Sequence, residues 1–196
     1  FFAGGPNSVR GFGQYQLGPS VLKIDALGNL LSADEASEFP GCDAQTINAG
    51  TCDVQALARK AADKFEIHPV GGAAALGGST ELRFPVLSNR LRGALFVDFG
   101  QVWSEAKSLR LSDVVVTPGA GLRYFSAIGP IRVDLGYNTQ GTRTLSVLTN
   151  KLCLKAEDPC TPDSIKPGVT YTKDQLQNSG TLTRLSDVAF GESRGF

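Results

Sequence analysis

Four segments between residues 73 and 138 alternate apolar side chains with glycine or charged side chains. Successive side chains of a β-strand point to opposite faces, so a two-residue period predicts strands. Stretches near 88–90, 104–116 and 128–130 separate the segments and predict two turns and a loop. One set of positions comprises Thr80, Leu82, Phe84, Val86, Leu95, Val97, Phe99, Ala120, Leu122, Tyr124, Ile131, Val133, Leu135 and Tyr137. The other set comprises Glu81, Arg83, Ala94, Phe96, Asp98, Gly100, Gly119, Gly121, Arg123, Arg132, Asp134 and Gly136. The pattern predicts four consecutive strands of about ten residues each.

The two faces of these strands differ in a way that is typical of a transmembrane β-barrel. In such a barrel one face of each strand meets lipid and the other lines a polar lumen. The alternative is a soluble β-sandwich, which buries the apolar face in a core and exposes the charges to water. Exposed sandwich faces favour Thr, Lys, Glu and Ser, whereas the second set mixes glycine with charges of both signs, which neighbouring strands can pair. We therefore predict an all-β fold, part of a transmembrane antiparallel barrel, with the lumen charges Glu81, Arg83, Asp98, Arg123, Arg132 and Asp134.

Asp98 stands between two apolar residues in the middle of the second segment. A carboxylate in such a position is stable only if a cation pairs with it or water reaches it. Arg10 is the candidate partner, in the stretch Ser8-Val9-Arg10-Gly11-Phe12, where Gly11 lets the backbone fold back tightly. The alternative is an ordinary surface loop that carries a solvated arginine.

Four stretches share their order and spacing with a known family. They are residues 1–12, ending in Val9-Arg10-Gly11-Phe12, then 78–85, then Phe96-Val97-Asp98-Phe99-Gly100, and finally 126–130. Together they resemble the C-terminal barrel third of the BamA-type outer-membrane assembly factors, also called the bacterial surface antigen family. This family includes TamA and the two-partner secretion transporters. The resemblance covers most of residues 1–138 outside one long insertion.

The resemblance implies a barrel of about sixteen strands preceded by periplasmic modules, of which this chain supplies about five strands. In that family the loop with Val9, Arg10, Gly11 and Phe12 tucks into the lumen, which implies that Arg10 reaches Asp98 in the strand motif Phe96, Asp98, Gly100. The implied function is the insertion or translocation of β-rich proteins at the bacterial outer membrane, without a cofactor. The implied partners are outer-membrane lipids, unfolded outer-membrane protein clients, accessory assembly proteins, and upstream barrel strands and periplasmic modules, since the chain begins within a motif.

The regions outside the four strands are expected to be loops and one further strand. Residues 1–72 are expected to form the arginine-bearing loop with an insertion, in which 53–65 has helical spacing and Asp53 is a candidate N-cap. Residues 139–181 are expected to form an extracellular loop. Residues 182–196 are expected to close the barrel, although their alternation is poor.

The four cysteines fall in two close pairs, Cys42 with Cys52 and Cys153 with Cys160. Four cysteines allow three connectivities, and the short spacings favour these local bridges. Free thiols are one alternative, and zinc is another, although zinc ligands are usually more closely spaced and the one histidine lies beside a proline. Disulfides indicate an oxidising compartment, which agrees with loops at a cell surface.

The composition argues against several other functions. The 19 basic and 19 acidic residues leave a net charge of zero, so no field favours nucleic acid. No run reaches the roughly 18–20 apolar residues that a membrane-spanning helix needs. We find no nucleophile motif and no phosphate loop, so neither an enzyme nor a metal site is predicted. A passive outer-membrane channel or structural barrel, a two-partner-type secretion transporter, and a soluble adhesion module with a sandwich fold stay open as alternatives.

Overall fold

The computed structural model describes residues 1–31, 42–88 and 90–190 of the 196-residue chain. These residues form two compact units, which are treated separately below. Both units are mainly β, which confirms the predicted fold class at that level. Within the described ranges, no helix is long and apolar enough to cross a lipid bilayer.

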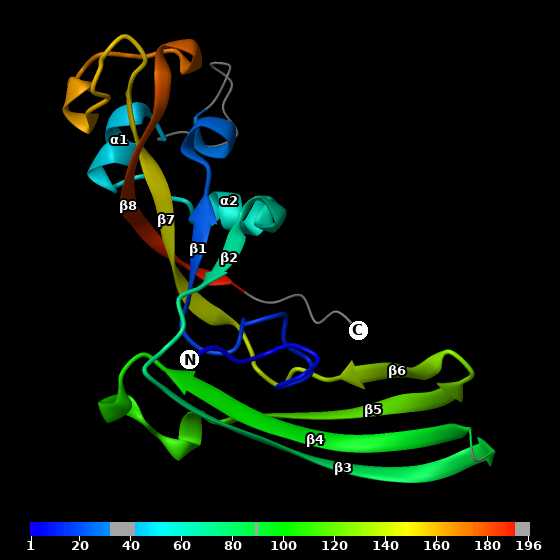
Figure 1. The fold of residues 1–196 in the computed structure, drawn as a ribbon. Helices are drawn as coiled ribbons and strands as arrows, with labels where there is room; N and C mark the ends of the chain where they lie inside the picture. Colours follow the sequence, from blue (N-terminus) through cyan, green and yellow to red (C-terminus); the bar gives the residue numbers. More distant parts are fainter. Residues whose placement is uncertain (32–41, 89, 191–196) are drawn as a thin grey trace. The chain divides into compact units, whose positions relative to one another are not determined.

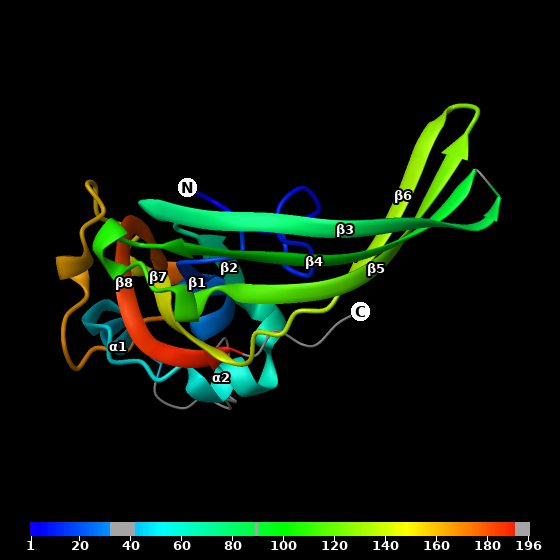
Figure 2. The same ribbon diagram turned by 90° about the horizontal axis from the view of Figure 1, so that it is seen from below.

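Unit 1, residues 1–20 and 69–141, is built on a four-stranded antiparallel meander. Its strands are β3 (Ala74–Ser88), β4 (Leu91–Trp103), β5 (Val115–Ser126) and β6 (Gly129–Gly136). Each strand pairs with the next one along the chain (Figure 1). The connection from β4 to β5 contains two 3-10 turns, η3 (Ala106–Ser108) and η4 (Leu111–Asp113). Figure 2 shows that the sheet is strongly twisted, with β6 running obliquely to β3. All four strands lie within the range 73–138, where the alternation predicts them.

The two faces of this sheet differ in what covers them. On β4, Ala94, Phe96 and Asp98 are buried, whereas Leu95 and Val97 between them are 51% and 44% exposed. β5 continues this alternation as far as Tyr124. The exposed apolar side chains of the other strands include Leu76, Leu82, Phe84, Val86, Leu122, Tyr124, Ile131, Val133 and Leu135. The polar face is therefore the covered face, and the apolar face is open, which is the reverse of a soluble sheet.

The segment 1–20 covers the polar face of the sheet. Val9, Phe12 and Leu17 from this segment form a small buried cluster with Val115 at the start of β5. A bridge between Ala3 and Leu17 closes the segment on itself, and Leu17 N–H donates to the Ala3 carbonyl at 3.0 Å. The segment is thus a compact loop and not an extension of a strand.

Unit 2, residues 21–68 and 142–190 within the described range, has its own sheet in the order β2-β1-β7-β8. Its strands are β1 (Ser20–Ile24), β2 (Glu66–Pro69), β7 (Arg143–Leu154) and β8 (Leu176–Phe190). The helices are α1 (Ala44–Ala49) and α2 (Gln55–Lys60), with short helical turns η1 (Ala26–Leu30), η2 (Ala62–Lys64), η5 (Pro162–Ser164) and η6 (Lys173–Gln175). β7 pairs in parallel with β1 and antiparallel with β8. The core lies between this sheet and the helices, and includes Leu22, Ile24, Ile47, Val54, Leu57, Val147, Leu152, Leu185 and Val188.

The predictions for the C-terminal third were wrong in two respects. Residues 139–181 are not a loop throughout, because they contain β7 and the start of β8. The described part of 182–196 does not extend the meander, because Leu182–Phe190 pairs with β7 in the other sheet, while residues 191–196 lie outside the described ranges. The alternation of residues 182–190 is poor because the register between β7 and β8 shifts. The shift places both Leu185 and Val188 in the core and breaks the two-residue period.

The prediction for residues 1–72 was also incomplete, since this region contains β1, β2 and α1. Helix α2 occupies only the middle of the predicted 53–65 segment, and its N-cap is Val54. Asp53 is therefore not the N-cap, although its Oδ1 atom accepts a hydrogen bond from Gln55 N–H at 2.9 Å. Both local disulfides are present, one between Cys42 and Cys52 and one between Cys153 and Cys160.

Candidate functional site: an arginine seat on the inner face of the meander

Arg10 lies at the tip of the covering loop, directly over β4. Gly11, the next residue, has a φ of +95°, a conformation that side chains other than glycine rarely adopt. The main-chain N–H of Arg10 also donates to Asp98 Oδ2, at 3.0 Å. The side chain and the backbone of Arg10 therefore approach the same carboxylate.

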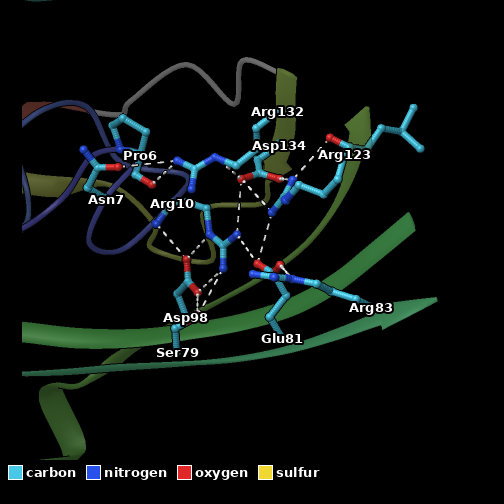
Figure 3. Close-up of polar contacts among 11 residues, drawn as sticks. Pro6, Asn7, Arg10, Ser79, Glu81, Arg83, Asp98, Arg123, Arg132 and Asp134 are labelled. Atoms are coloured by element: carbon cyan, nitrogen blue, oxygen red, sulfur yellow. Dashed lines mark hydrogen bonds and ion pairs between the residues drawn. The ribbon is translucent and has the colours of Figure 1, made fainter. Parts of the chain in front are cut away.

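The Arg10 guanidinium has all five of its N–H donors engaged (Figure 3). Nε and Nη2 form a two-pronged contact with Asp98, each at 2.7 Å. Nη2 also donates to Ser79 Oγ at 3.1 Å, and Nη1 donates to Glu81 Oε2 at 2.9 Å and to Asp134 Oδ2 at 3.2 Å. One side chain of the loop thus joins three of the four strands.

Asp98 is completely buried and accepts four hydrogen bonds. Three of these come from Arg10, and the fourth comes from Ser79 Oγ at 2.6 Å. Four is about the full capacity of a carboxylate, so no acceptor site of Asp98 stays unsatisfied. The Asp98 carboxylate also holds the pKa of Arg10 above its ordinary value, because it binds the charged form of the guanidinium, and this outweighs desolvation.

Glu81 and Asp134 form an outer ring around this pair with three further arginines. Arg123 on β5 binds both carboxylates, with Nη2 at 3.1 Å from Glu81 Oε2 and 3.2 Å from Asp134 Oδ2. Its Nη1 also bonds to Asp134 Oδ1. Arg83 binds Glu81 at 2.7 Å, and Arg132 lies 3.3 Å from Asp134. The site therefore holds three carboxylates and four guanidinium groups.

Glycines on the polar face make room for the loop. A Cβ atom on Gly136 of β6 would lie 2.8 Å from backbone atoms of both Arg10 and Gly11. A Cβ atom on Gly119 of β5 would collide with the ring of Phe96. That ring in turn lies under Arg10, whose Cζ atom is 3.4 Å from the ring centroid, a cation–π contact. The glycines that alternate with the charges are thus required by close packing and not only by flexibility.

The structure brings together nearly all of the residues that the sequence singled out for this site. Val9 and Phe12 pack in the cluster beneath the loop, and a Cβ atom on Gly100 would lie 2.7 Å from the Val9 side chain. Arg83 stays at the rim, with 63% of its side chain exposed. Arg132 reaches further than its strand, since its Nη2 atom donates to the carbonyl of Pro6 in the loop at 2.9 Å.

Two features of the site could not be read directly from the motifs. Ser79 binds both Arg10 and Asp98. It lies within the stretch 78–85, but there only its position two residues before Glu81, on the same face of β3, distinguishes it. The sharing of Arg10 among Asp98, Glu81 and Asp134 was also not foreseen, because a simple pair satisfies the argument from burial. The four cysteines lie in the other unit and take no part in this site.

Residues 1–147 match the model of the Omp85 superfamily domain. This match covers three quarters of the chain and includes the whole loop and the whole meander. It therefore includes every residue of the arginine seat, which we define as Arg10 with Ser79, Glu81, Asp98 and Asp134 and the surrounding Arg83, Arg123 and Arg132. Proteins of this superfamily are outer-membrane proteins that insert or secrete other proteins. The chain belongs to the Omp85 superfamily.

Proposed function

We propose that this chain is part of a BamA-type outer-membrane barrel that inserts β-rich client proteins into the membrane. The observation that carries the proposal is the seat of Arg10, in which a loop side chain engages five acceptors on the covered face of the meander. A loop held in this way favours a barrel whose lumen contains the loop. An unobstructed pore has no need for such a seat.

The opposite face of the meander supports contact with lipid. Leu82 and Leu135 are 65% and 63% exposed, and the apolar side chains of this face have no cover among the described residues of unit 1. Strands β3, β4 and β5 contain 15, 13 and 12 residues, and about 9–11 residues suffice to cross a bilayer. Outer-membrane lipids are therefore the proposed partner of this face.

The edges of the meander support additional strands. Neither β3 nor β6 has a second neighbour within the described ranges, and unpaired backbone groups at a sheet edge are costly in hydrocarbon. We infer that strands outside the described sheet complete the barrel. Unfolded outer-membrane proteins are the proposed clients, and accessory assembly proteins and periplasmic modules are the proposed further partners.

Within this function, the Arg10–Asp98 pair acts as a lock that selects one position of the loop. Desolvation offsets much of the attraction in a buried ion pair, so the pair is not chiefly a source of stability. Its specificity comes from geometry, because the observed loop position satisfies the five guanidinium donors and the four acceptor sites of Asp98 together, and a displaced loop would lose several of these bonds at once.

The test is depletion of the protein followed by complementation with variants. Arg10→Ala and Asp98→Ala are expected to fail to restore the levels of other outer-membrane barrels, while the variants keep their own β circular dichroism signal. Arg92→Ala is the control, because Arg92 lies on β4 outside the seat and contacts the ring of Phe125. Variants that complement like the wild type would refute the lock.

Two other outcomes distinguish the alternative functions. Normal levels of other barrels after depletion, together with steady ion conductance that does not depend on clients, would favour a passive channel. Loss of one secreted protein alone would favour a secretion transporter.

A further inference from the structure

Arg123 binds two of the four carboxylate oxygens that Arg10 uses. Glu81 Oε2 accepts from Arg10 at 2.9 Å and from Arg123 at 3.1 Å. Asp134 Oδ2 accepts from each arginine at 3.2 Å. Arg123 is itself 9% exposed, so this contact is largely shielded from water. Two like charges are therefore held next to each other by two shared anions (Figure 3).

The three carboxylates of the seat differ in what they keep if the loop departs. Glu81 keeps Arg83 and Arg123, and Asp134 keeps Arg123 and Arg132. Asp98 keeps only the hydroxyl of Ser79, because every ion pair of Asp98 among the described residues comes from Arg10. The cost of undocking the loop is thus concentrated on Asp98.

We propose that Arg123 takes the place of Arg10 as the cation for Glu81 and Asp134 when the loop leaves, and that this makes docking of the loop reversible. With the loop docked, four guanidinium groups face three carboxylates, and with the loop undocked, three face three. Without Arg123, undocking leaves two partly exposed guanidinium groups for three carboxylates. Arg123 therefore lowers the free energy of undocking, both by neutralising Glu81 and Asp134 in advance and by repelling Arg10. The inference rests on the proposed lock and adds that the lock is built to open.

The chain offers a matched control for Arg123. Arg92 is directly opposite Arg123 in the pairing of β4 with β5, and it lies on the same face of the sheet. Its guanidinium sits 5.5 Å from the centroid of the Phe125 ring, and no ion pair of Arg92 is present among the described residues. Arg92→Gln therefore removes an equal charge from the adjacent position without touching the shared carboxylates.

Cleavage by trypsin after Arg10 measures undocking directly. Arg10 is 8% exposed when docked, so the protease reaches the Arg10–Gly11 bond only when the loop has left its seat. The membrane-embedded protein that carries this chain is treated with trypsin, and the product with Gly11 as its new N-terminus is quantified over time. Asp98→Asn is expected to raise the rate roughly tenfold or more, since hydrogen bonds to a charged group are lost.

Arg123→Gln is expected to lower the same rate about threefold or more, as befits an ion pair of moderate strength. Arg92→Gln is expected to leave it unchanged, and Arg123→Lys, which keeps the charge, is expected to stay near the wild type. Faster cleavage in Arg123→Gln would overturn the inference and make Arg123 a support of the docked loop. If Arg123→Gln does not assemble, faster cleavage in Arg123→Lys would overturn it in the same way. A loop that stays uncut in Asp98→Asn as well would instead refute the lock itself.

Discussion

Removal of the Arg10 side chain is expected to shift the covering loop from docked to undocked. Arg10→Ala leaves the fully buried Asp98 with the Ser79 hydroxyl and, if the loop stays, the main-chain N–H of residue 10. Hydrogen bonds to a charged group contribute about 1.5–3 kcal/mol each, so the two side-chain bonds that Asp98 loses correspond to roughly 3–6 kcal/mol. Removing one partner of a buried ion pair typically costs about 3–5 kcal/mol. Water returns part of this once the loop leaves, so we expect a loss in docking free energy of about 3 kcal/mol.

The assay is the rate of thiol labelling at Val9→Cys. Val9 is 2% exposed in the docked loop, and all four native cysteines of this chain are in disulfides. If docking equilibrates faster than labelling, the rate is proportional to the undocked fraction. About 3 kcal/mol then corresponds to a roughly hundredfold faster rate in Arg10→Ala, because each 1.4 kcal/mol is a factor of ten. Arg10→Lys is expected to lie between, since an ammonium keeps the charge but not the planar fork.

A double-mutant cycle shows whether the effect belongs to the Arg10–Asp98 contact. Once Arg10 is alanine, Asp98→Ala is expected to add little, because its main partner is already gone. The reasoning fails if Arg10→Ala labels within about threefold of its parent, or if the two single effects simply add.

Two further predictions concern packing and cross-linking. Gly136→Ala is expected to speed labelling at Val9→Cys roughly tenfold, because its Cβ would meet the loop backbone at 2.8 Å. Gly141→Ala is the control and is expected to have no effect, since a Cβ there has nothing within 4 Å. Equal labelling rates in the two variants would contradict the packing argument. Replacing Cys153 and Cys160 by serine is expected to destabilise unit 2 by about 2.5 kcal/mol, from the loop entropy of a bridge between residues seven apart. Labelling at Val9→Cys is expected to stay unchanged. Limited proteolysis measures the loss of stability, and an unchanged cleavage rate would show that the bridge adds little.

The meander could be predicted from the sequence because its signal is local and regular. The middle of β4 and most of β5 alternate with a two-residue period, and Asp98 stands out as a charge between apolar neighbours. A charge in that position requires a counter-ion, which directs attention to Arg10 even though 88 residues separate the two. A charged residue that would be unfavourable without a partner thus indicates, from a single sequence, a contact with a distant residue.

Unit 2 could not be predicted because its determinants are neither regular nor costly when considered alone. The register shift near Leu148 hides the period of β8. β1 is only five residues long and pairs in parallel with β7, where Thr149 Oγ1 donates to the Ile24 carbonyl across 125 positions. Helix α1 is held to β7 through Asn48, whose side-chain amide donates to the Leu152 carbonyl and accepts from its N–H. None of these residues is unfavourable on its own, so no single position demands a partner.

The number and arrangement of its donors explain why arginine, and not lysine, occupies position 10. A lysine at position 10 has three donors on one nitrogen and could satisfy Asp98 in several orientations of the loop. The guanidinium divides its five donors between Asp98 and Ser79 on one side and Glu81 and Asp134 on the other. These acceptors come from β3, β4 and β6, so a shift of the loop along any strand breaks bonds to the other two. A network that spans the strands in this way defines the loop position in two directions, which a single ion pair cannot do.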